Sequence, residues 1–294
     1  MSKANRFLHP SRLIVIAFFG VIALGTMVLT MPFVTTSGKA TGFADALFTA
    51  TSAVTVTGLG TLDTETYWNI YGHWTIAILI QIGGFGIVGF ATLLGYLIDG
   101  RISLKNRLSA STESSVSGKS DVKNLITSIL KMTLFFQTLL FIFLTFRFLN
   151  EYDYDFTKAL GHGAFHSISA FNNAGFALYS DSLMGFARDG WIIIPIFMGA
   201  FFGSLGFPVL SEIWERMKHK TNIMIGREVG FMPKQWSLNS RIILWASLLL
   251  VGGGTVYIAV LEWSNPQTLG PLSPFSKVID SIFAAIMPRT AGFN

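Results

Sequence analysis

The sequence predicts an all-α membrane protein built from repeated modules, each a helix, a short pore helix, a filter strand and a second helix. Of its 294 residues, 51% are hydrophobic and 13% charged, with a mean hydropathy of +0.54. About a quarter of the residues of a soluble domain are charged. A repeat is the second observation, because Gly58, Gly175 and Gly292 follow one another at intervals of 117 residues.

The first module begins with an apolar run over residues 13–33, long enough to span a bilayer. No Ala-x-Ala cleavage site follows this run, so we expect a membrane helix and not a signal peptide. A short amphipathic segment over residues 43–53 precedes Gly58, and a second apolar run over residues 74–98 follows it.

The same pattern returns twice. Short mixed helices are expected over residues 156–170 and 275–286, and longer apolar runs over 125–149, 191–213 and 242–263. The predicted organisation is a first pore module (1–98), a serine-rich cytoplasmic loop (99–122), a second pore module (123–217), a charged cytoplasmic loop (218–237) and a third, incomplete pore module (238–294).

The flanks of the three glycines are also aligned. Phe48 and Phe165 each lie ten residues before their glycine, and Phe283 lies nine residues before Gly292. Continuing the period would place a fourth glycine about 117 residues beyond Gly292. We therefore expect the 294 residues by themselves not to conduct, since three filters leave backbone unpaired.

Each glycine ends a candidate filter segment. In an extended Thr-Val-Thr-Gly strand, successive carbonyls can face one axis and replace the hydration shell of a potassium ion. Glycine permits the positive φ that this geometry needs. Alone, the pattern is more typical of an ordinary strand entering a turn, and its repetition in an apolar context favours the filter. The candidate filter residues are Thr55, Val56, Thr57, Gly58, Asn172, Asn173, Ala174, Gly175, Thr290, Ala291 and Gly292.

Charge placement predicts the topology. Fourteen of the 21 lysines and arginines lie in the N-terminal segment and in segments 99–123 and 212–241. The positive-inside rule makes this side, including the N-terminus, cytoplasmic. Acidic residues gather on the outer side, where they can concentrate cations or simply keep the loops soluble: Asp63, Glu65, Glu151, Asp153, Asp155, Asp181, Asp189 and Asp280.

Other motifs in the sequence are weaker evidence for a functional site. Gly84-x-Gly86-x-x-Gly89 matches a dinucleotide fingerprint, but it lies inside an apolar run with no strand before it, so close helix packing explains it better. His162 and His166 have the spacing of a metal pair without an evident third ligand. The chain has no cysteine and no nucleophile motif, and its basic residues form no patch with aromatics. We expect neither an enzyme nor a nucleic-acid binder.

Arg289 precedes the third filter segment. A cation there could act as a barrier to permeation, but an unpaired arginine at membrane depth is costly. We expect Arg289 to support the pore loop by binding a carboxylate or backbone carbonyls.

The three motifs Thr-Val-Thr-Gly-Leu, Phe-Asn-Asn-Ala-Gly-Phe and Pro-Arg-Thr-Ala-Gly-Phe-Asn, in this order and spacing, resemble the KtrB branch of the Trk/Ktr/HKT superfamily of potassium transporters. The resemblance covers the whole chain. It implies four pore modules around a pseudo-fourfold axis in a bacterial cytoplasmic membrane. It also implies a homodimer, a cytosolic KtrA-like ring that binds ATP or ADP and controls the gate, and uptake of potassium that sodium often stimulates.

Two alternatives stay open: a non-conducting truncated scaffold, and a sodium-coupled secondary transporter of another solute. Inverted repeats would mark such a transporter, whereas these repeats keep one orientation. No cofactor is expected on the chain itself. The gate is expected beyond residue 294. The selectivity for potassium over sodium, sodium coupling and the regulatory nucleotide are not determined by these residues.

Overall fold

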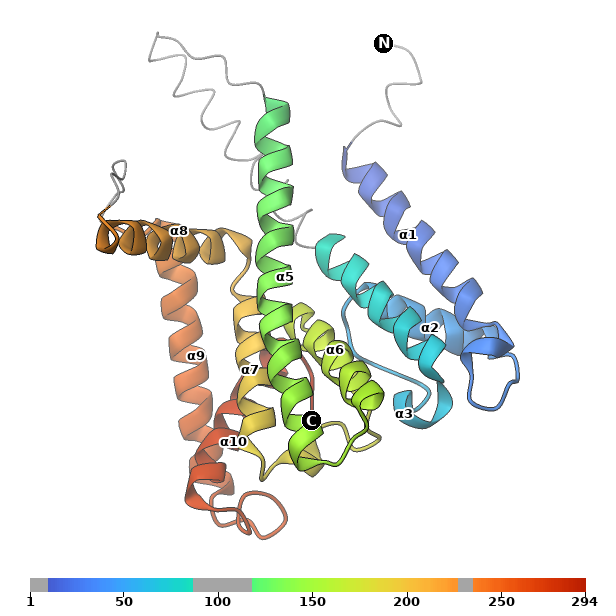
Figure 1. The fold of residues 1–294 in the computed structure, drawn as a ribbon. Coiled ribbons are helices and arrows are strands. Elements are labelled where there is room, and N and C mark those ends of the chain that lie inside the picture. The colour runs from blue at the N-terminus through green and yellow to red at the C-terminus, as the bar shows by residue number, and fades with distance from the viewer. Residues whose placement is uncertain (1–9, 87–117, 227–234) are drawn as a thin grey trace.

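The computed structural model describes residues 10–86, 118–226 and 235–294, which are helical without a β-strand. The helices that overlap the predicted long apolar runs are α1 (Pro10–Leu29), an unlabelled helix over residues 70–86, α5 (Gly118–Glu151), α7 (Gly190–Ser204), α8 (Phe207–Met224) and α9 (Leu238–Glu262). The other elements are η2 (Pro32–Val34), α2 (Phe43–Val54), α3 (Thr64–Tyr67), α6 (Phe156–Asn172), η3 (Met184–Phe186), α10 (Pro274–Ile286) and η4 (Met287–Arg289). This architecture is that of an all-α protein and fits insertion in a membrane (Figure 1).

Two described segments, Thr127–Glu151 within α5 and Leu238–Glu262 in α9, are long and apolar enough to cross a membrane. The pair α7 and α8 would make a third span if the two helices are counted together. α1 and α2 contain shorter apolar segments. The run predicted over residues 74–98 lies only partly within the described residues.

Two of the helices that precede the glycines, α6 and α10, begin at side chains that cap them. The Asp155 carboxylate accepts a hydrogen bond from the Lys158 amide at 2.7 Å and starts α6. The Ser273 hydroxyl accepts from the Ser276 amide at 3.2 Å, and Pro274 occupies the first turn of α10. Both are standard helix starts, since a cap satisfies an otherwise unpaired amide and proline needs none.

The apolar run predicted over residues 191–213 is not one straight helix. α7 ends at Ser204, and α8 leaves at an angle of 105° (Figure 1). Gly206 has φ +80°, and Pro208 follows in the first turn of α8, where its missing amide cannot continue the helical ladder. The beginning of the segment predicted as a charged loop (218–237) is therefore helical, because α8 continues to Met224.

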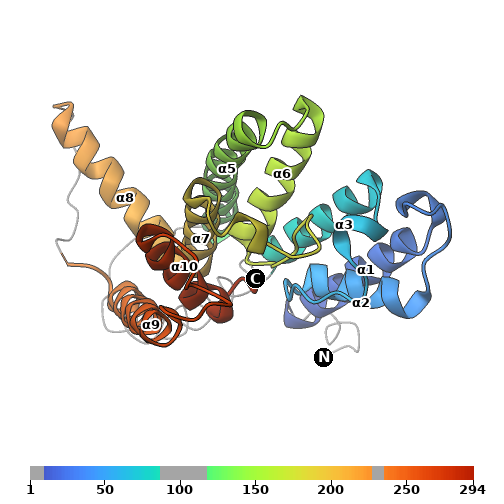
Figure 2. The same ribbon diagram turned by 90° about the horizontal axis from the view of Figure 1, so that it is seen from below.

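Seen from below, the helices form three neighbouring groups: α1 with α2, α5 with α6 and α7, and α9 with α10 (Figure 2). Buried side chains join the groups. Phe176 and Leu178, from the segment after α6, pack in one core with residues of α1 and α2. Phe293 packs in a second core with residues of α5 and α7. The second and third groups thus each bury an aromatic residue, Phe176 and Phe293, in a core shared with the group before it.

One ion pair fixes the C-terminal end of α5 to the start of α7. Arg147 Nε lies 2.9 Å from Asp189 Oδ2, and the Tyr152 hydroxyl donates to the same oxygen at 3.0 Å. The Asp189 side chain is only 8% exposed, whereas Glu151, the second partner of Arg147 at 3.2 Å, is 55% exposed. The buried carboxylate depends on its cation far more than the exposed one does.

We predict that Arg147→Gln lowers the free energy of unfolding by about 1–3 kcal/mol, because it leaves a buried carboxylate with reduced pairing. Glu151→Gln is the matched control and should have little effect, since exposed ion pairs contribute little. Thermal unfolding in detergent, followed by size-exclusion chromatography, measures the stability of both variants. Equal melting temperatures for the two variants would contradict this assignment.

Candidate functional site

The three glycines that the sequence singled out lie in turns directly after α2, α6 and α10. Their φ values are +77°, +73° and +69° for Gly58, Gly175 and Gly292, in the region that glycine adopts without steric cost. The turns also meet. A Cβ on Gly58 would clash with the carbonyl oxygen of Ala174, and one on Gly175 would clash with that of Ala291.

These contacts run in chain order, from the first turn to the second and from the second to the third. Each joins a glycine to the residue before the next glycine, so the two contacts are equivalent. The structure therefore brings together Gly58, Ala174, Gly175, Ala291 and Gly292 as a row of adjoining backbone, which we call the glycine row.

The first segment is not the extended strand that the sequence predicted. Thr55 has φ −84° and ψ 0°, and Val56 has φ +56°, so the chain turns back over the end of α2. The amide of Thr57 then donates to the Ser52 carbonyl at 2.9 Å. Hydrogen bonding to the helix end, which a pattern of β-branched residues does not reveal, overrides the extended preference.

The second segment repeats this turn. Asn173 has φ +62°, and the Ala174 amide donates to the Ser169 carbonyl at 2.8 Å. Asparagine tolerates the left-handed conformation, whereas a β-branched valine is strained there. Val56 therefore holds a backbone conformation that its own side chain disfavours.

The third turn is one residue shorter. Thr290 has φ −148°, and it is Gly292 itself whose amide donates to a carbonyl five residues back, that of Met287, at 3.0 Å. The shift matches the spacing of the phenylalanines, since Phe283 lies nine residues before its glycine and Phe165 ten.

Two cavities adjoin the glycine row. One, of about 170 Å³, is bordered by Gly58, Gly175 and the loop residues that follow them, including Asp63. The other, of about 150 Å³, is bordered by Val56, Asn172 and Asn173, together with helical residues. In the first two segments, Val56 and Asn173, two positions before the glycines, thus face one cavity, and Gly58 and Gly175 face the other.

Hydrogen bonds hold the second segment from several helices. The Asn172 amide nitrogen lies 3.2 Å from Gln81 Oε1, which also accepts from Gln137 at 2.8 Å. The Asn173 amide nitrogen, oriented toward acceptors, lies 2.8 Å from the Ala200 carbonyl and 2.9 Å from the Thr290 hydroxyl. Asn173 therefore connects the second and third segments.

Glycines in the following helices accommodate the ends of the short helices. A Cβ on Gly83 would clash with the carbonyl of Val54, the last residue of α2. A Cβ on Gly203 would clash with the carbonyl of Phe171 near the end of α6. Both glycines thus allow close helix packing, the role that the sequence predicted for the Gly84-x-Gly86-x-x-Gly89 motif. Gly89 of the fingerprint-like motif lies outside the described residues.

Hydrogen bonds connect the loops that follow the three glycines. Glu65 Oε2 accepts from both the amide and the hydroxyl of Ser180, at 2.7 and 2.9 Å. The Ser182 hydroxyl accepts from the Asn294 amide at 3.0 Å. The loop after Gly175 thus contacts both the loop after Gly58 and the residues after Gly292.

Arg289 and the histidines have specific partners. Arg289 Nη2 donates to the Ser247 hydroxyl of α9 at 2.7 Å, where the sequence predicted a carboxylate or backbone carbonyls. His166 is fully buried, with Nδ1 2.8 Å from the His162 carbonyl and Nε2 accepting from the Leu178 amide at 3.2 Å. Both ring nitrogens of His166 have a partner in the fold, and they fix the segment after Gly175 to α6.

The sequence reasoning missed Gln81 and Gln137, and it named Glu65 only as one of the acidic residues, without its partner Ser180. A glutamine inside an apolar run is a usable signal, since a polar side chain at membrane depth needs a partner. Its partner could not have been identified, because Gln81 and Asn172 are 91 residues apart.

Comparison with known proteins gives a family. The TrkH family model, described as a cation transport protein, matches residues 3–294. The chain is 34% identical to Ktr system potassium uptake protein B of Vibrio alginolyticus, over 96% of the chain and 59% of that protein. It is 35% identical to the protein of the same description from Bacillus subtilis (strain 168), over 97% of the chain and 60% of that protein.

A third relative is Potassium/sodium uptake protein NtpJ of Enterococcus hirae, which is 33% identical over 99% of the chain. The chain covers 61% of that protein's length. The chain thus spans about three fifths of the length of these three relatives.

We predict that Val56→Asn raises the free energy of unfolding by about 1 kcal/mol, because asparagine adopts positive φ with less strain than valine. Val278→Asn in α10 is the control, since Val278 has ordinary helical backbone. Thermal unfolding in detergent compares them. The strain assignment fails if Val56→Asn is as destabilising as the control.

We also predict that Gly203→Ala destabilises the protein by about 1–3 kcal/mol, since the new methyl group meets the Phe171 carbonyl. Gly253→Ala in α9 is the control, because its methyl group would meet nothing within 4 Å. Melting temperatures of the purified variants provide the measurement. If Gly203→Ala loses no more stability than the control, α6 and α7 are not in close contact at this position.

Proposed function

The chain belongs to the TrkH family of cation transport proteins, and we propose that it forms part of a potassium uptake pathway across a bacterial cytoplasmic membrane. The relatives named for potassium uptake support the choice of ion. The glycine row between two cavities is the observation that carries the proposal, because a permeation path needs a narrow backbone-lined passage with space at both ends.

In this proposal, backbone carbonyls of the three segments replace water around a dehydrated potassium ion. The carbonyls come from Thr55, Val56, Thr57, Asn172, Asn173, Ala174, Thr290 and Ala291, and the glycines provide the close approach. Three repeated modules, with a fourth supplied by further sequence, surround the path on a pseudo-fourfold axis. The module boundaries at residues 98, 122, 217 and 237 belong to this proposal.

Helix ends and acidic residues favour a cation along this path. α2, α6 and α10 all end next to the glycine row, and a helix C-terminus carries about half a unit of negative charge. Burial raises the pKa of Asp63, but hydrogen bonds from Ser180 and Thr66 outweigh it and hold the pKa below the ordinary aspartate value. An ionised Asp63 would attract cations to the cavity it lines.

Arg289 would support the third segment without entering the path. Its guanidinium reaches Ser247 on α9, outside the glycine row. This arrangement favours a supporting role over that of a barrier.

The remaining features follow from family membership and are proposed with it. They are a multi-pass topology with a cytoplasmic N-terminus, a homodimer, a cytosolic KtrA-like ring that binds ATP or ADP, and stimulation by sodium. The relative described as a potassium/sodium uptake protein supports the mention of sodium. No cofactor on the chain itself is needed for ion passage.

We predict that Gly58→Ser and Gly175→Ser each lower potassium uptake at least about tenfold, because the new side chain would displace a carbonyl of the neighbouring segment. The test expresses the complete gene in cells lacking potassium uptake and measures growth and rubidium influx at low potassium. Gly38→Ser is the matched control, since Gly38 also has positive φ, +66°, but open space around it.

Membrane abundance of each variant is measured by immunoblot, which separates loss of uptake from loss of protein. Uptake unchanged by either filter substitution would refute the glycine row as the permeation path. Equal loss in Gly38→Ser would attribute the effect to backbone strain.

A further inference from the structure

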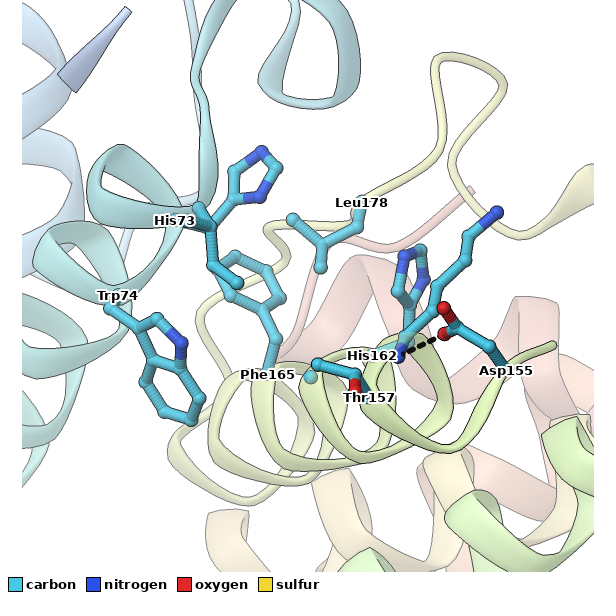
Figure 3. Close-up of a pocket in the computed structure, with 10 residues that line it drawn as sticks. His73, Trp74, Asp155, Thr157, His162, Phe165 and Leu178 are labelled. Atoms are coloured by element: carbon cyan, nitrogen blue, oxygen red, sulfur yellow. Dashed lines mark hydrogen bonds between the residues drawn. The ribbon is translucent and has the colours of Figure 1, made fainter. Parts of the chain in front are cut away.

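A third cavity lies away from the glycine row. It has a volume of about 350 Å³ and lies between the start of the 70–86 helix and the first half of α6. His73 and Trp74 border it on one side, and Thr157, His162 and Phe165 on the other (Figure 3). Ion passage as proposed above makes no use of this cavity.

The polar side of this cavity carries one charge of each sign. Asp155 and Lys158 both line it and are exposed. The ion pairs among the described residues include neither of them. The Lys158 ammonium lies 4.0 Å from the centre of the Tyr154 ring, and the Asp155 carboxylate uses one oxygen to cap α6. A ligand with an anionic and a cationic group matches this pair.

The apolar side continues beyond the cavity as a stripe. Ile70 and Trp74 line the cavity and are 54% and 42% exposed. Ile78 and Ile82 follow at the same spacing of four residues and are 55% and 45% exposed. Four residues apart is one face of a helix, and twelve residues rise about 18 Å. One leaflet of bilayer hydrocarbon is about 15 Å thick, half of the whole core.

Gly161 shows that the cavity has room for a ligand group. It lies in the middle of α6 and lines the cavity, and a Cβ there would meet nothing within 4 Å. The cavity is also lined by Phe165 of α6 and by Leu178 of the following segment, and both pack in one core with residues of α1 and α2. A molecule in this cavity would therefore contact two modules at once.

We propose that the cavity binds a zwitterionic phospholipid whose headgroup ends in a primary ammonium. Its phosphate contacts Lys158 and the Thr157 hydroxyl, its ammonium faces Asp155, and one acyl chain follows the stripe from Ile70 to Ile82. A soluble ligand would leave the stripe unused, and a purely anionic lipid would leave Asp155 facing a like charge. This inference does not rest on potassium transport.

The test uses native mass spectrometry of the full protein purified in mild detergent, with phosphatidylethanolamine and phosphatidylglycerol of identical acyl chains as probes. We expect one phosphatidylethanolamine to bind at least about tenfold more tightly than phosphatidylglycerol, since only the former places an ammonium beside Asp155. Gly161→Trp should remove this binding by filling the cavity. Lys158→Ala should weaken it several-fold by removing the partner of the phosphate.

Two controls separate the cavity from the general membrane surface. Gly253→Trp places the same indole at an open glycine of α9, and Lys277→Ala removes a half-buried lysine that lies over Trp263. Both should bind phosphatidylethanolamine like the parent. A monodisperse size-exclusion peak establishes folding. If Gly161→Trp does not fold, Lys158→Ala tests the proposal in its place, and unchanged binding by Lys158→Ala then refutes it.

Three further results would overturn the proposal. They are equal or tighter binding of phosphatidylglycerol, retention of phosphatidylethanolamine in folded Gly161→Trp, and a change of oligomeric state in Gly161→Trp without loss of lipid. The last result would identify a second copy of the chain as the occupant of this face.

Discussion

The structure depends on the contact between consecutive glycine turns. Gly58 lies against the Ala174 carbonyl, and Gly175 against the Ala291 carbonyl, in a space that admits no Cβ. Side chains cannot mediate such an approach, so the position of each turn is set directly by the backbone of the next. Protein interiors are close-packed and adjust poorly to an added methyl group. The helices that carry the turns must therefore be placed with matching accuracy.

That accuracy comes from contacts around the row. Gly83 and Gly203 let the following helices pack directly on the ends of α2 and α6. Phe176 and Phe293 bury their rings, each 3% exposed, in the core of the preceding group. Backbone contact, helix packing and aromatic burial thus act on the same boundaries between consecutive helix groups, which joins the second and third groups to the group before each of them.

Polar contacts add what apolar packing cannot supply, namely direction. Asn172 donates to Gln81, which also accepts from Gln137, and Asn173 reaches Thr290 of the next segment. Apolar burial is non-directional and tolerates rotation of a loop, whereas an amide fixes the orientation of its partners. The second segment, which has neighbours on both sides, holds both of these amide contacts.

The sequence by itself determined the class and the repeat. Composition predicts a membrane protein, and the interval of 117 residues places three short helices close to the observed α2, α6 and α10. These properties are local, because hydropathy and glycine spacing are written along the chain. Only the tertiary structure decided the rest. The left-handed turn at Val56, the 105° bend after α7 and the partner of Gln81 depend on helix ends and on contacts between residues far apart. Sequence patterns report which residues need partners, and the fold alone determines which partners they meet.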